Sequence, residues 1–565
     1  MSVEVQAGGE AGVTASGLDH LGMGAQHHQE LSVGMSEIVE SQPFHARLFD
    51  RRQPDPLTKM HCDASDAIDR REHPAFRIAG GSDLSGEQFD EEWWGGERPP
   101  PGVGLRLTAD EPPFDFVDSA LNLDPASKHV EVRHLESDDL TEADSLWFRT
   151  PMTPKLFAAQ HLESLVTMTC ELVDIPSETG REGPIAAYVA DRFGQIGMRV
   201  EMQQVEAGRS NVIARWGGTR PGPRLMFLAH FDTSTSPGPG LPFGYQPKAV
   251  VRDGWIYGLG VSNMKCAFAA FHSAMQMIQL AQPDLPGEIL MVGVVGEIEK
   301  APIDEWQGKR YRGGGIGARV MLNRGVTADY CINGEPTGLR LQTGNAGYVF
   351  ARLSVAGTRQ HTFSKQLAVD PIEKAVQLRR SLVDFEATYL VRHPHQVMKP
   401  LINVGSIYGG DPFKPSLTAG TCNLYVHVNT LPGQTVSSLR AELEEFLDEQ
   451  RALDPDLSVS LNFYLASNGH HWEPDHPLPQ AVARAHARVF GEEVTVPSPE
   501  RYSVSSDNSP LAEFGIPGVT YGAGGINLSG EYSMYEPGVG EVVGINNLAA
   551  AARVYAAAAV DLLSA

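Results

Sequence analysis

The sequence predicts an α/β fold in which a mainly parallel sheet is covered by helices and a second, smaller unit is inserted. Two observations indicate this fold. From about residue 155, short apolar runs alternate with segments of helical spacing, an alternation typical of a parallel sheet. Between about residues 344 and 465 the order changes to strand, helix, strand, strand, helix, strand, which is the βαββαβ order of a ferredoxin-like unit.

Composition and length limit the class of protein. The chain has 565 residues, of which 42% are hydrophobic, so it can bury the cores of several domains. Its five cysteines are widely spaced without a C-x-x-C pair, which argues against a disulfide framework and fits a reducing cytoplasm. The formal net charge of −25 argues against nucleic acid or an anionic membrane as a partner. Because we also find no secretory signal and no apolar run of roughly 20 residues, we expect a cytoplasmic protein.

Residues 1–150 differ from the rest of the chain. Acidic residues outnumber basic ones, Gly and Pro are frequent, and apolar periodicity is poor. Such a composition often cannot bury enough surface to offset the entropy of ordering, so we predict an acidic arm that is largely extended or disordered. The alternative is a segment that docks on the main body through aromatic side chains, namely Trp93, Trp94, Phe114, Phe116 and Trp147.

The main α/β unit is predicted in two parts, residues 151–343 and 466–565. The first part begins with a helix from about Leu156 to Ile175 and a second helix after Ile185. Its expected strands are Asn211–Trp216, Leu225–His230, Glu288–Gly296 and Tyr330–Asn333, with helices after Asn263 and from about Gly315 to Arg324. The second part contains a helix over Pro479–Phe490, a strand over Gly518–Tyr521 and a final helix over Asn546–Leu563.

The insert spans residues 344–465. Its predicted elements are a strand over Tyr348–Ala356, a helix over Pro371–Leu390, strands over Ile402–Tyr408 and Cys422–Val428, a helix over Ser437–Leu453 and a strand over Leu457–Leu465. A sheet of this kind leaves an exposed edge strand, and proteins usually cover or pair such an edge. We therefore predict that the insert makes the protein a homodimer.

Three predicted strands of the main unit end in residues suited to chemistry. His230 ends the run Leu225–Ala229, Glu297 follows the strand that starts at Glu288, and Glu335 follows Asn333. Ligands in open α/β sheets bind at the carboxyl ends of the strands. An imidazole and two carboxylates in one crevice would repel each other or lose solvation unless a cation or a proton joined them. The pattern therefore favours a metal or catalytic site over a structural hydrogen-bonded pair.

In these strand-end residues and in the motifs around them, the chain resembles the M20 family of metallo-aminoacylases and peptidases. That family includes acetylornithine deacetylases, succinyl-diaminopimelate desuccinylases and carboxypeptidases that cleave folate glutamate. The resemblance covers about residues 155–563, including the insert, and leaves the acidic arm outside. Its motifs are Leu228-Ala229-His230-Phe231-Asp232-Thr233, Asp253-Gly254-Trp255-Ile256-Tyr257-Gly258-Leu259-Gly260-Val261-Ser262-Asn263-Met264-Lys265, Val295-Gly296-Glu297, Asn333-Gly334-Glu335-Pro336-Thr337, His361, Asn403-Val404-Gly405, Gly409-Gly410, Pro432-Gly433, Ser506-Asp507 and Gly515-Ile516-Pro517.

The resemblance implies roles for the residues at the strand ends. In the family two divalent metals, usually zinc, share a bridging carboxylate and a water, and a glutamate takes the proton of that water. By motif position His230 and Glu335 would hold one metal, and Glu297 would be the general base. Asp232 would support the ligand His230.

The resemblance also implies roles for the insert, which corresponds to the family's lid and dimerisation domain. His361 would reach the reacting oxyanion, in this family commonly from the partner subunit. Asn403, Gly409 and Gly410 would bind substrate.

The chain departs from the family pattern around one of the two metals. Asn263 replaces the bridging aspartate, Ile298 replaces the glutamate after the base, and no histidine precedes Glu541. Ile298 and the missing histidine would serve the same metal, so we expect that position to be lost. One divalent metal, zinc as the first candidate, would then be held by His230, Glu335 and Asn263, weakly or not at all.

Two alternatives stay open for this region. Glu299 or Glu536 could restore a ligand, and Asn263 could simply cap the following helix. In addition, Asn429 stands where the family has a basic residue that recognises a substrate carboxylate.

The function that these observations favour is hydrolysis of an amide bond in a small acyl-amino acid or peptide by metal-assisted attack of water. The alternatives are a protein that has lost hydrolysis and uses its cleft for binding, and metal-independent acid/base chemistry with Glu297.

Overall fold

The computed structural model describes residues 154–396, 398–497 and 504–564, and the backbone of five short strands nearer the N-terminus. Three of these, β1 (Met60–His61), β2 (Phe76–Ile78) and β3 (Ser82–Leu84), form an antiparallel sheet. Strands β4 (Ser119–Asn122) and β5 (Glu131–His134) form an antiparallel pair. Apart from these strands, the predicted acidic arm lies outside the described residues. All elements named below belong to the compact unit Phe114–Ala565.

The main sheet has six strands in the order β19-β12-β8-β11-β7-β6. Its members are β6 (Arg199–Glu206), β7 (Arg209–Gly217), β8 (Arg224–His230), β11 (Glu288–Val294), β12 (Tyr330–Asn333) and β19 (Gly518–Thr520). The four strands from β19 to β11 are parallel, which confirms the predicted fold class.

Two details of this sheet differ from the prediction. Strand β7 is antiparallel to β11, because only six residues without a helix connect β7 to β8 and the chain must reverse direction there. Strand β6, which pairs antiparallel with β7, was not predicted. It is an exposed edge strand with the sequence RVEMQQVE, so it has no continuous apolar run.

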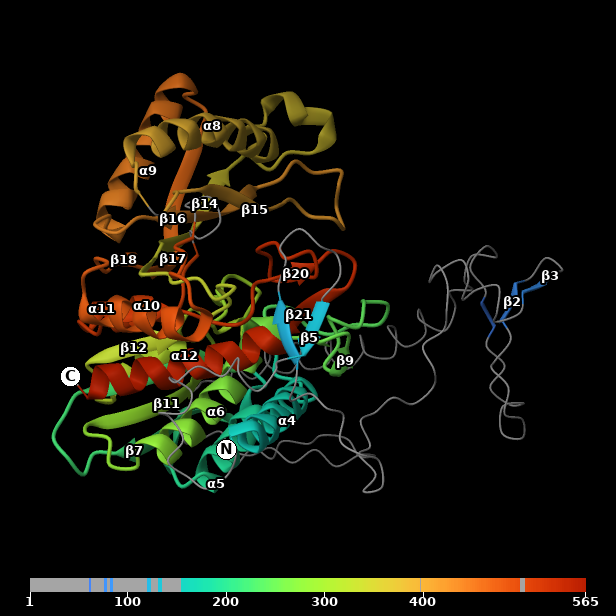
Figure 1. Ribbon diagram of the computed structural model, residues 1–565. Coiled ribbons are helices and arrows are strands. Elements are labelled where there is room, and N and C mark those ends of the chain that lie inside the picture. Colours follow the sequence, from blue (N-terminus) through green and yellow to red (C-terminus); the bar gives the residue numbers. More distant parts are fainter. Residues whose placement is uncertain are drawn as a thin grey trace, which may run out of the picture. The chain divides into compact units, whose positions relative to one another are not determined.

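Helices cover both faces of the main sheet. Along β8, Leu225, Phe227 and Ala229 belong to one core and Met226 and Leu228 to another, as expected for a strand buried on both sides. The first core is completed by α4 (Pro154–Val173), α5 (Gly183–Gln195), α6 (Cys266–Ala281), α10 (Pro477–Phe490) and α12 (Ile545–Leu563). The second is completed by α7 (Ile316–Asn323) and α11 (Asn508–Glu513). In Figure 1, α12 and α6 lie side by side on the sheet.

A small antiparallel sheet brings the C-terminal region next to the start of α6. Its strands are β9 (Val250–Arg252), β10 (Trp255–Tyr257), β20 (Tyr535–Glu536) and β21 (Gly540–Gly544). Ile256 of β10 is paired with Val543 of β21, although they are far apart in the sequence. Glu541 of β21 is thereby held beside the turn that leads into α6.

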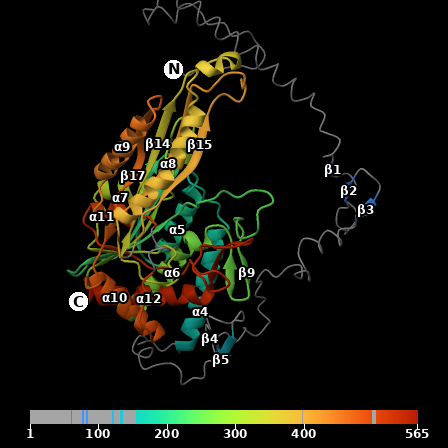
Figure 2. The ribbon, with the colours of Figure 1, turned by 90° about the horizontal axis from the view of Figure 1, so that it is seen from above.

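The insert forms a four-stranded antiparallel sheet in the order β15-β16-β14-β17. Its elements are β14 (Gly347–Ala356), α8 (Pro371–Arg392), β15 (Ile402–Gly409), β16 (Thr421–Thr430), α9 (Val436–Leu453) and β17 (Ser458–Ser467). Figures 1 and 2 show α8 and α9 on one face of this sheet, running along the strands. The predicted βαββαβ unit is confirmed, and side chains such as Leu382, Leu424 and Phe446 give it a core of its own.

Strands β13 (Gly344–Asn345) and β18 (His470–His471) pair where the chain leaves the main unit and returns to it. Among the helices of the described residues, none is long and apolar enough to cross a membrane.

The buried imidazole of His272 makes a prediction about stability. His272 lies on α6, is 5% exposed and stacks on Phe193. Burial lowers the pKa of His272 to about 4, and the positive charge of Arg192 adds to this effect. Because the unfolded chain then binds the proton better, this group costs stability as the pH falls from about 6.5 towards 4. Phenylalanine cannot titrate. We therefore expect the free energy of unfolding of His272→Phe to rise, relative to that of the native chain, by roughly 1 kcal/mol for each unit by which the pH falls over this range. Urea unfolding at pH 7.5 and 5 measures this, and an equal difference at both pH values would contradict it.

Candidate active site

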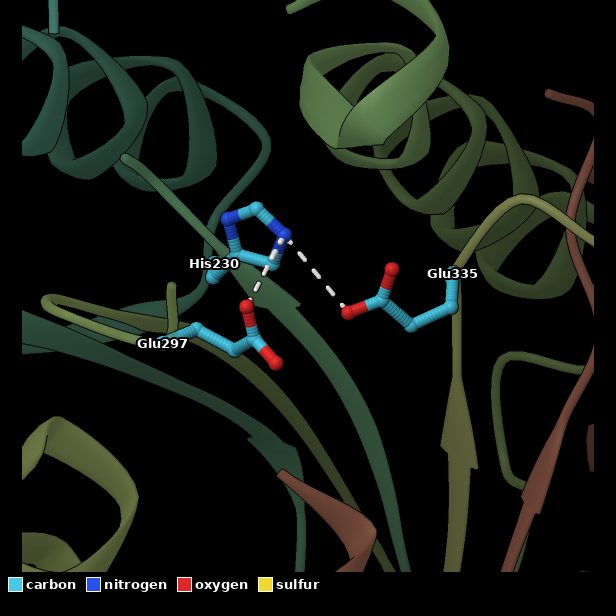
Figure 3. A group of neighbouring side chains, drawn as sticks. All are labelled: His230, Glu297 and Glu335. Atoms are coloured by element: carbon cyan, nitrogen blue, oxygen red, sulfur yellow. Dashed lines mark ion pairs between the residues drawn. The ribbon is translucent and has the colours of Figure 1, made fainter. Parts of the chain in front are cut away.

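The structure brings three side chains together at the carboxyl ends of adjacent parallel strands. His230 is the last residue of β8, and Glu297 and Glu335 follow its two neighbours β11 and β12. His230 Nε2 lies 3.5 Å from Glu335 Oε1 and 3.8 Å from Glu297 Oε2. Figure 3 shows both carboxylates directed at this ring nitrogen. The arrangement follows from strand order, because the carboxyl ends of parallel neighbours meet at one edge of the sheet.

The three groups shift one another's proton affinities. Burial would lower the pKa of His230, but the carboxylates of Glu335, Asp232 and Asp507 outweigh it and raise that pKa. Burial raises the pKa of Glu335 to about 7, although His230 acts in the opposite direction. Burial, followed by the charges of Glu335 and Asp507, raises the pKa of Glu297 well above its usual range. Perturbed groups of this kind are typical of functional sites.

Asp232 anchors the turn that carries Glu297. Its side chain is 1% exposed, and its two oxygens accept hydrogen bonds from the backbone N–H groups of Glu297 (3.0 Å) and Ile298 (3.3 Å). The hydroxyl of Thr179 donates a third hydrogen bond, at 2.9 Å. Asp232 Oδ1 also lies 3.7 Å from His230 Nδ1, the nitrogen that faces away from Glu335. The carboxylate therefore holds the Glu297 turn by hydrogen bonds and lies beside the imidazole, whose Nδ1 has no hydrogen-bond partner.

Asn263 joins the group from the turn before α6, which is the short π-helix η4 (Val261–Lys265) with non-helical backbone at Asn263 and Met264. Its Oδ1 lies 2.9 Å from His230 Nε2, the same nitrogen that faces the two carboxylates. Because α6 begins only at Cys266, the Asn263 side chain contacts the site rather than capping the helix.

The donor set fits one divalent cation. His230, Glu297 and Glu335 each offer a ligand atom, and these atoms lie within 4.8 Å of one another. The Asn263 amide oxygen adds a fourth donor beside the imidazole. One nitrogen with carboxylate and amide oxygens suits zinc and other borderline divalent ions. If Glu297 acts as a base, His230, Glu335 and Asn263 remain to hold the ion.

The residues that the sequence analysis considered for a second ion are apolar or hydrogen-bonded elsewhere. Ile298 is buried and apolar, and Glu299 accepts a hydrogen bond from Ser505 Oγ at 2.5 Å. Glu536 accepts one from the backbone N–H of Leu528 at 2.9 Å. The hydroxyl of Tyr535, in the region where a histidine was expected, lies 2.9 Å from Ser234 Oγ. Within the described ranges, His230, Glu297 and Glu335 form the one group of three or more candidate ligands.

The other expected site residues lie on the insert and are not brought to this group. The imidazole of His361 is exposed and stacks on the ring of Phe363, with 4.9 Å between the ring centroids. Its Nδ1 accepts a long hydrogen bond of 3.5 Å from the backbone N–H of Phe363. Asn403 is exposed on β15, at the edge of the inserted sheet. Gly409 and Gly410 are surrounded by residues of the insert, including Cys422 and Ala419.

Two buried carboxylates near the site were given no role by the sequence analysis. Asp507 is 2% exposed, and its Oδ1 has no hydrogen-bond partner. It lines a small, partly open pocket together with Glu297 and Tyr348. Glu541 is fully buried and contacts the turn that carries Asn263. Asp507 belongs to the Ser506-Asp507 motif of the resemblance, but the sequence analysis assigned it no chemistry, and in the structure its side chain makes no capping hydrogen bond to α11. The lone glutamate in the apolar strand GEVVG was a signal that could have pointed to Glu541.

Comparison with known families agrees with this geometry. The model of peptidase family M20/M25/M40 matches residues 226–561, which is more than half of the chain. The chain belongs to this family. It is therefore an enzyme of the M20 peptidase and amidohydrolase type, as the sequence motifs indicated.

Sequence relatives of the chain include acetylornithine deacetylases. The acetylornithine deacetylase of Vibrio parahaemolyticus is 27% identical over 326 residues, which is 56% of this chain and 79% of the relative. The acetylornithine deacetylase of Aliivibrio fischeri strain MJ11 is 28% identical over 299 residues, 51% of this chain and 72% of the relative.

Solved M20-type structures share the fold. Human carnosine dipeptidase 1 has a TM-score of 0.57 at 15% identity and covers 75% of this chain and 100% of its own. For a tripeptidase from Staphylococcus aureus the TM-score is 0.53 at 20% identity, and the match covers 71% of this chain and 98% of the tripeptidase. At these identities the likeness supports the fold alone.

Proposed function

We propose that this M20 enzyme hydrolyses the amide bond of a small acyl-amino acid or peptide, with Glu297 as general base and at most one bound divalent metal. The observation that carries the proposal is the convergence of Glu297 with His230 and Glu335 at one sheet edge. A cleft used only for binding has no need of a buried carboxylate with a raised pKa beside an imidazole.

In the proposed mechanism Glu297 moves the protons. Its carboxylate accepts a proton from the attacking water as the water oxygen bonds to the amide carbon. It then gives that proton to the amide nitrogen as the carbon–nitrogen bond breaks, so that a carboxylic acid and an amine are released. Asp232 holds the Glu297 turn through two backbone N–H groups during both transfers. A divalent metal bound by His230, Glu335 and Asn263 would lower the pKa of water from 15.7 towards about 7.

The substrate class rests on relatives and on one replaced residue. Both reported relatives are acetylornithine deacetylases by name, which supports an N-acyl amino acid as substrate. Asn429, 4% exposed at the end of β16, stands where the family has a basic residue, so carboxylate recognition must use other groups.

A panel of N-acetyl and N-succinyl amino acids and dipeptides, assayed for amine release with purified protein of measured metal content, tests the proposal. We expect release from at least one acyl-amino acid. Tight binding without release by metal-loaded protein would instead favour the function of a binding protein. Release that survives complete metal removal would favour metal-independent chemistry.

We further propose a division into a catalytic unit, residues 151–343 and 466–565, and a lid, residues 344–465, in a cytoplasmic homodimer. The lid's edge strand β15 has one unpaired side, and Ile407 and Tyr408 on it are 49% and 50% exposed. An open apolar edge of this kind favours pairing with a second copy.

Light scattering at micromolar concentration is expected to give the mass of a dimer. Ile407→Glu should shift the protein towards monomer, because it places a charge on the proposed contact. The control Val391→Glu changes an 80% exposed residue near the end of α8 and should leave the mass unchanged. A monomer in the unchanged protein would contradict the dimer.

A further inference from the structure

The turn that carries Asn263 is held by a carboxylate from the other end of the enzyme. Glu541 on β21 is 0% exposed. Its Oε1 accepts a hydrogen bond from the backbone N–H of Gly260 at 3.0 Å. Its Oε2 accepts two more, from Ser262 at 3.1 Å and Asn263 at 3.0 Å. One side chain thus binds three of four consecutive backbone N–H groups.

These three N–H groups need that acceptor. The turn precedes α6, which begins at Cys266, and Gly260 has a left-handed φ of +81°, so the N–H groups lie outside the hydrogen-bond ladder of α6. Buried backbone N–H groups without an acceptor are costly. Burial raises the pKa of Glu541 to about 7, although the buried ammonium of Lys265 acts in the opposite direction and favours the charged form. Lys265 itself donates to the Ile175 carbonyl at 2.7 Å.

The same turn reaches the proposed hydrolytic centre. The backbone N–H of Asn263 binds Glu541, while its side-chain oxygen lies 2.9 Å from His230 Nε2. His230 Nε2 in turn faces Glu335 and Glu297. A shift of the turn would therefore move the one amide oxygen that contacts the imidazole.

We infer that Glu541 is a positioning residue: by clamping the backbone of residues 260–263 it keeps Asn263 on His230, and it acts on hydrolysis only through Asn263. The inference rests on the proposed function and extends it to a residue that does not contact the group around His230 directly.

A double-mutant cycle separates this role from a general structural one. Glu541→Gln keeps the shape of the side chain, but it replaces one acceptor oxygen by an NH2 group, which cannot accept hydrogen bonds from the backbone N–H groups. We expect it to lower kcat roughly 10-fold to 50-fold with KM changed less than about 3-fold, because small displacements in a catalytic site cost rate. In the Asn263→Ala background, adding Glu541→Gln should lower kcat by no more than about 2-fold. Losses that multiply in the double variant would overturn the inference.

Two readouts are independent of turnover. The affinity for Co²⁺, followed by its visible absorption, should fall in Glu541→Gln and show the same lack of additivity with Asn263→Ala. Hydrogen exchange of the segment 258–266 should become faster in Glu541→Gln. If no substrate is hydrolysed at all, the proposed function fails, while these two measurements still decide the role of Glu541. An unchanged rate of hydrogen exchange in this segment would overturn the inference that Glu541 holds the turn.

The matched control is Asp329→Asn. Asp329 also accepts a backbone N–H, that of Arg224 at 2.7 Å, but at the opposite end of the strand that carries His230. It should leave kcat, Co²⁺ affinity and the exchange of residues 258–266 near native values. If Glu541→Gln does not fold, Glu541→Asp replaces it in the cycle. That variant keeps the charge but withdraws the carboxylate by one methylene, and it should show a smaller loss with the same coupling to Asn263. Additive losses in that cycle would equally overturn the inference.

Discussion

Glutamine in place of Glu297 is expected to lower turnover by at least about 100-fold, the usual scale for loss of a general base. The change keeps the shape of the side chain and its capacity for hydrogen bonding, but an amide cannot accept the proton of the attacking water. The turn itself should be preserved, because Asp232 binds the backbone N–H groups of residues 297 and 298 and not the side chain. KM should therefore change little while kcat falls.

The control for this prediction is Glu299→Gln. Glu299 is two residues further along, and its carboxylate accepts a hydrogen bond from Ser505 rather than facing His230. This variant should retain most of the turnover. Near-native turnover in Glu297→Gln would show that another group is the base, and Asp507, buried beside the same pocket, would be the next candidate.

Removal of metal is expected to reduce activity by at least about 100-fold, since a divalent ion contributes several kcal/mol of transition-state stabilisation. One equivalent per chain should restore it. The ion should be partly lost on dialysis against chelator, because one imidazole, one carboxylate and one amide oxygen form a weaker set than three strong ligands. Elemental analysis of dialysed and reloaded protein measures both quantities.

Asn263→Asp is the matched variant for the metal count. It restores the carboxylate that the M20 family places between two metals, yet the count should stay at one. Ile298 still offers no oxygen, and the hydroxyl of Tyr535 is paired with Ser234. Two stoichiometric metals in the unchanged protein would mean that Glu299, Glu536 or another residue completes a second position.

Some parts of the fold and site could be predicted because they depend on short, regular patterns. The strands that end at His230 and lead to Glu297 and Glu335 are continuous apolar runs, and parallel neighbours bring their carboxyl ends to one edge. Strand β6 could not be recognised, because an exposed edge strand needs few apolar residues. The lone glutamate in GEVVG indicated a buried Glu541, but its role could not be predicted. Its partner Asn263 lies 278 residues earlier, and no local pattern connects positions so far apart.

The insertion also sets an order in which the enzyme can be assembled during synthesis. All strands of the four-stranded sheet come from residues 347–467, and within the described residues they pair only with one another. This stretch can therefore close its own core on the ribosome, since domains generally fold as units. The six-stranded sheet cannot be completed until β19 has been made, and the turn before α6 lacks its acceptor until residue 541 has been made. The insert can thus fold on a nascent chain before that chain is able to hold a complete hydrolytic centre.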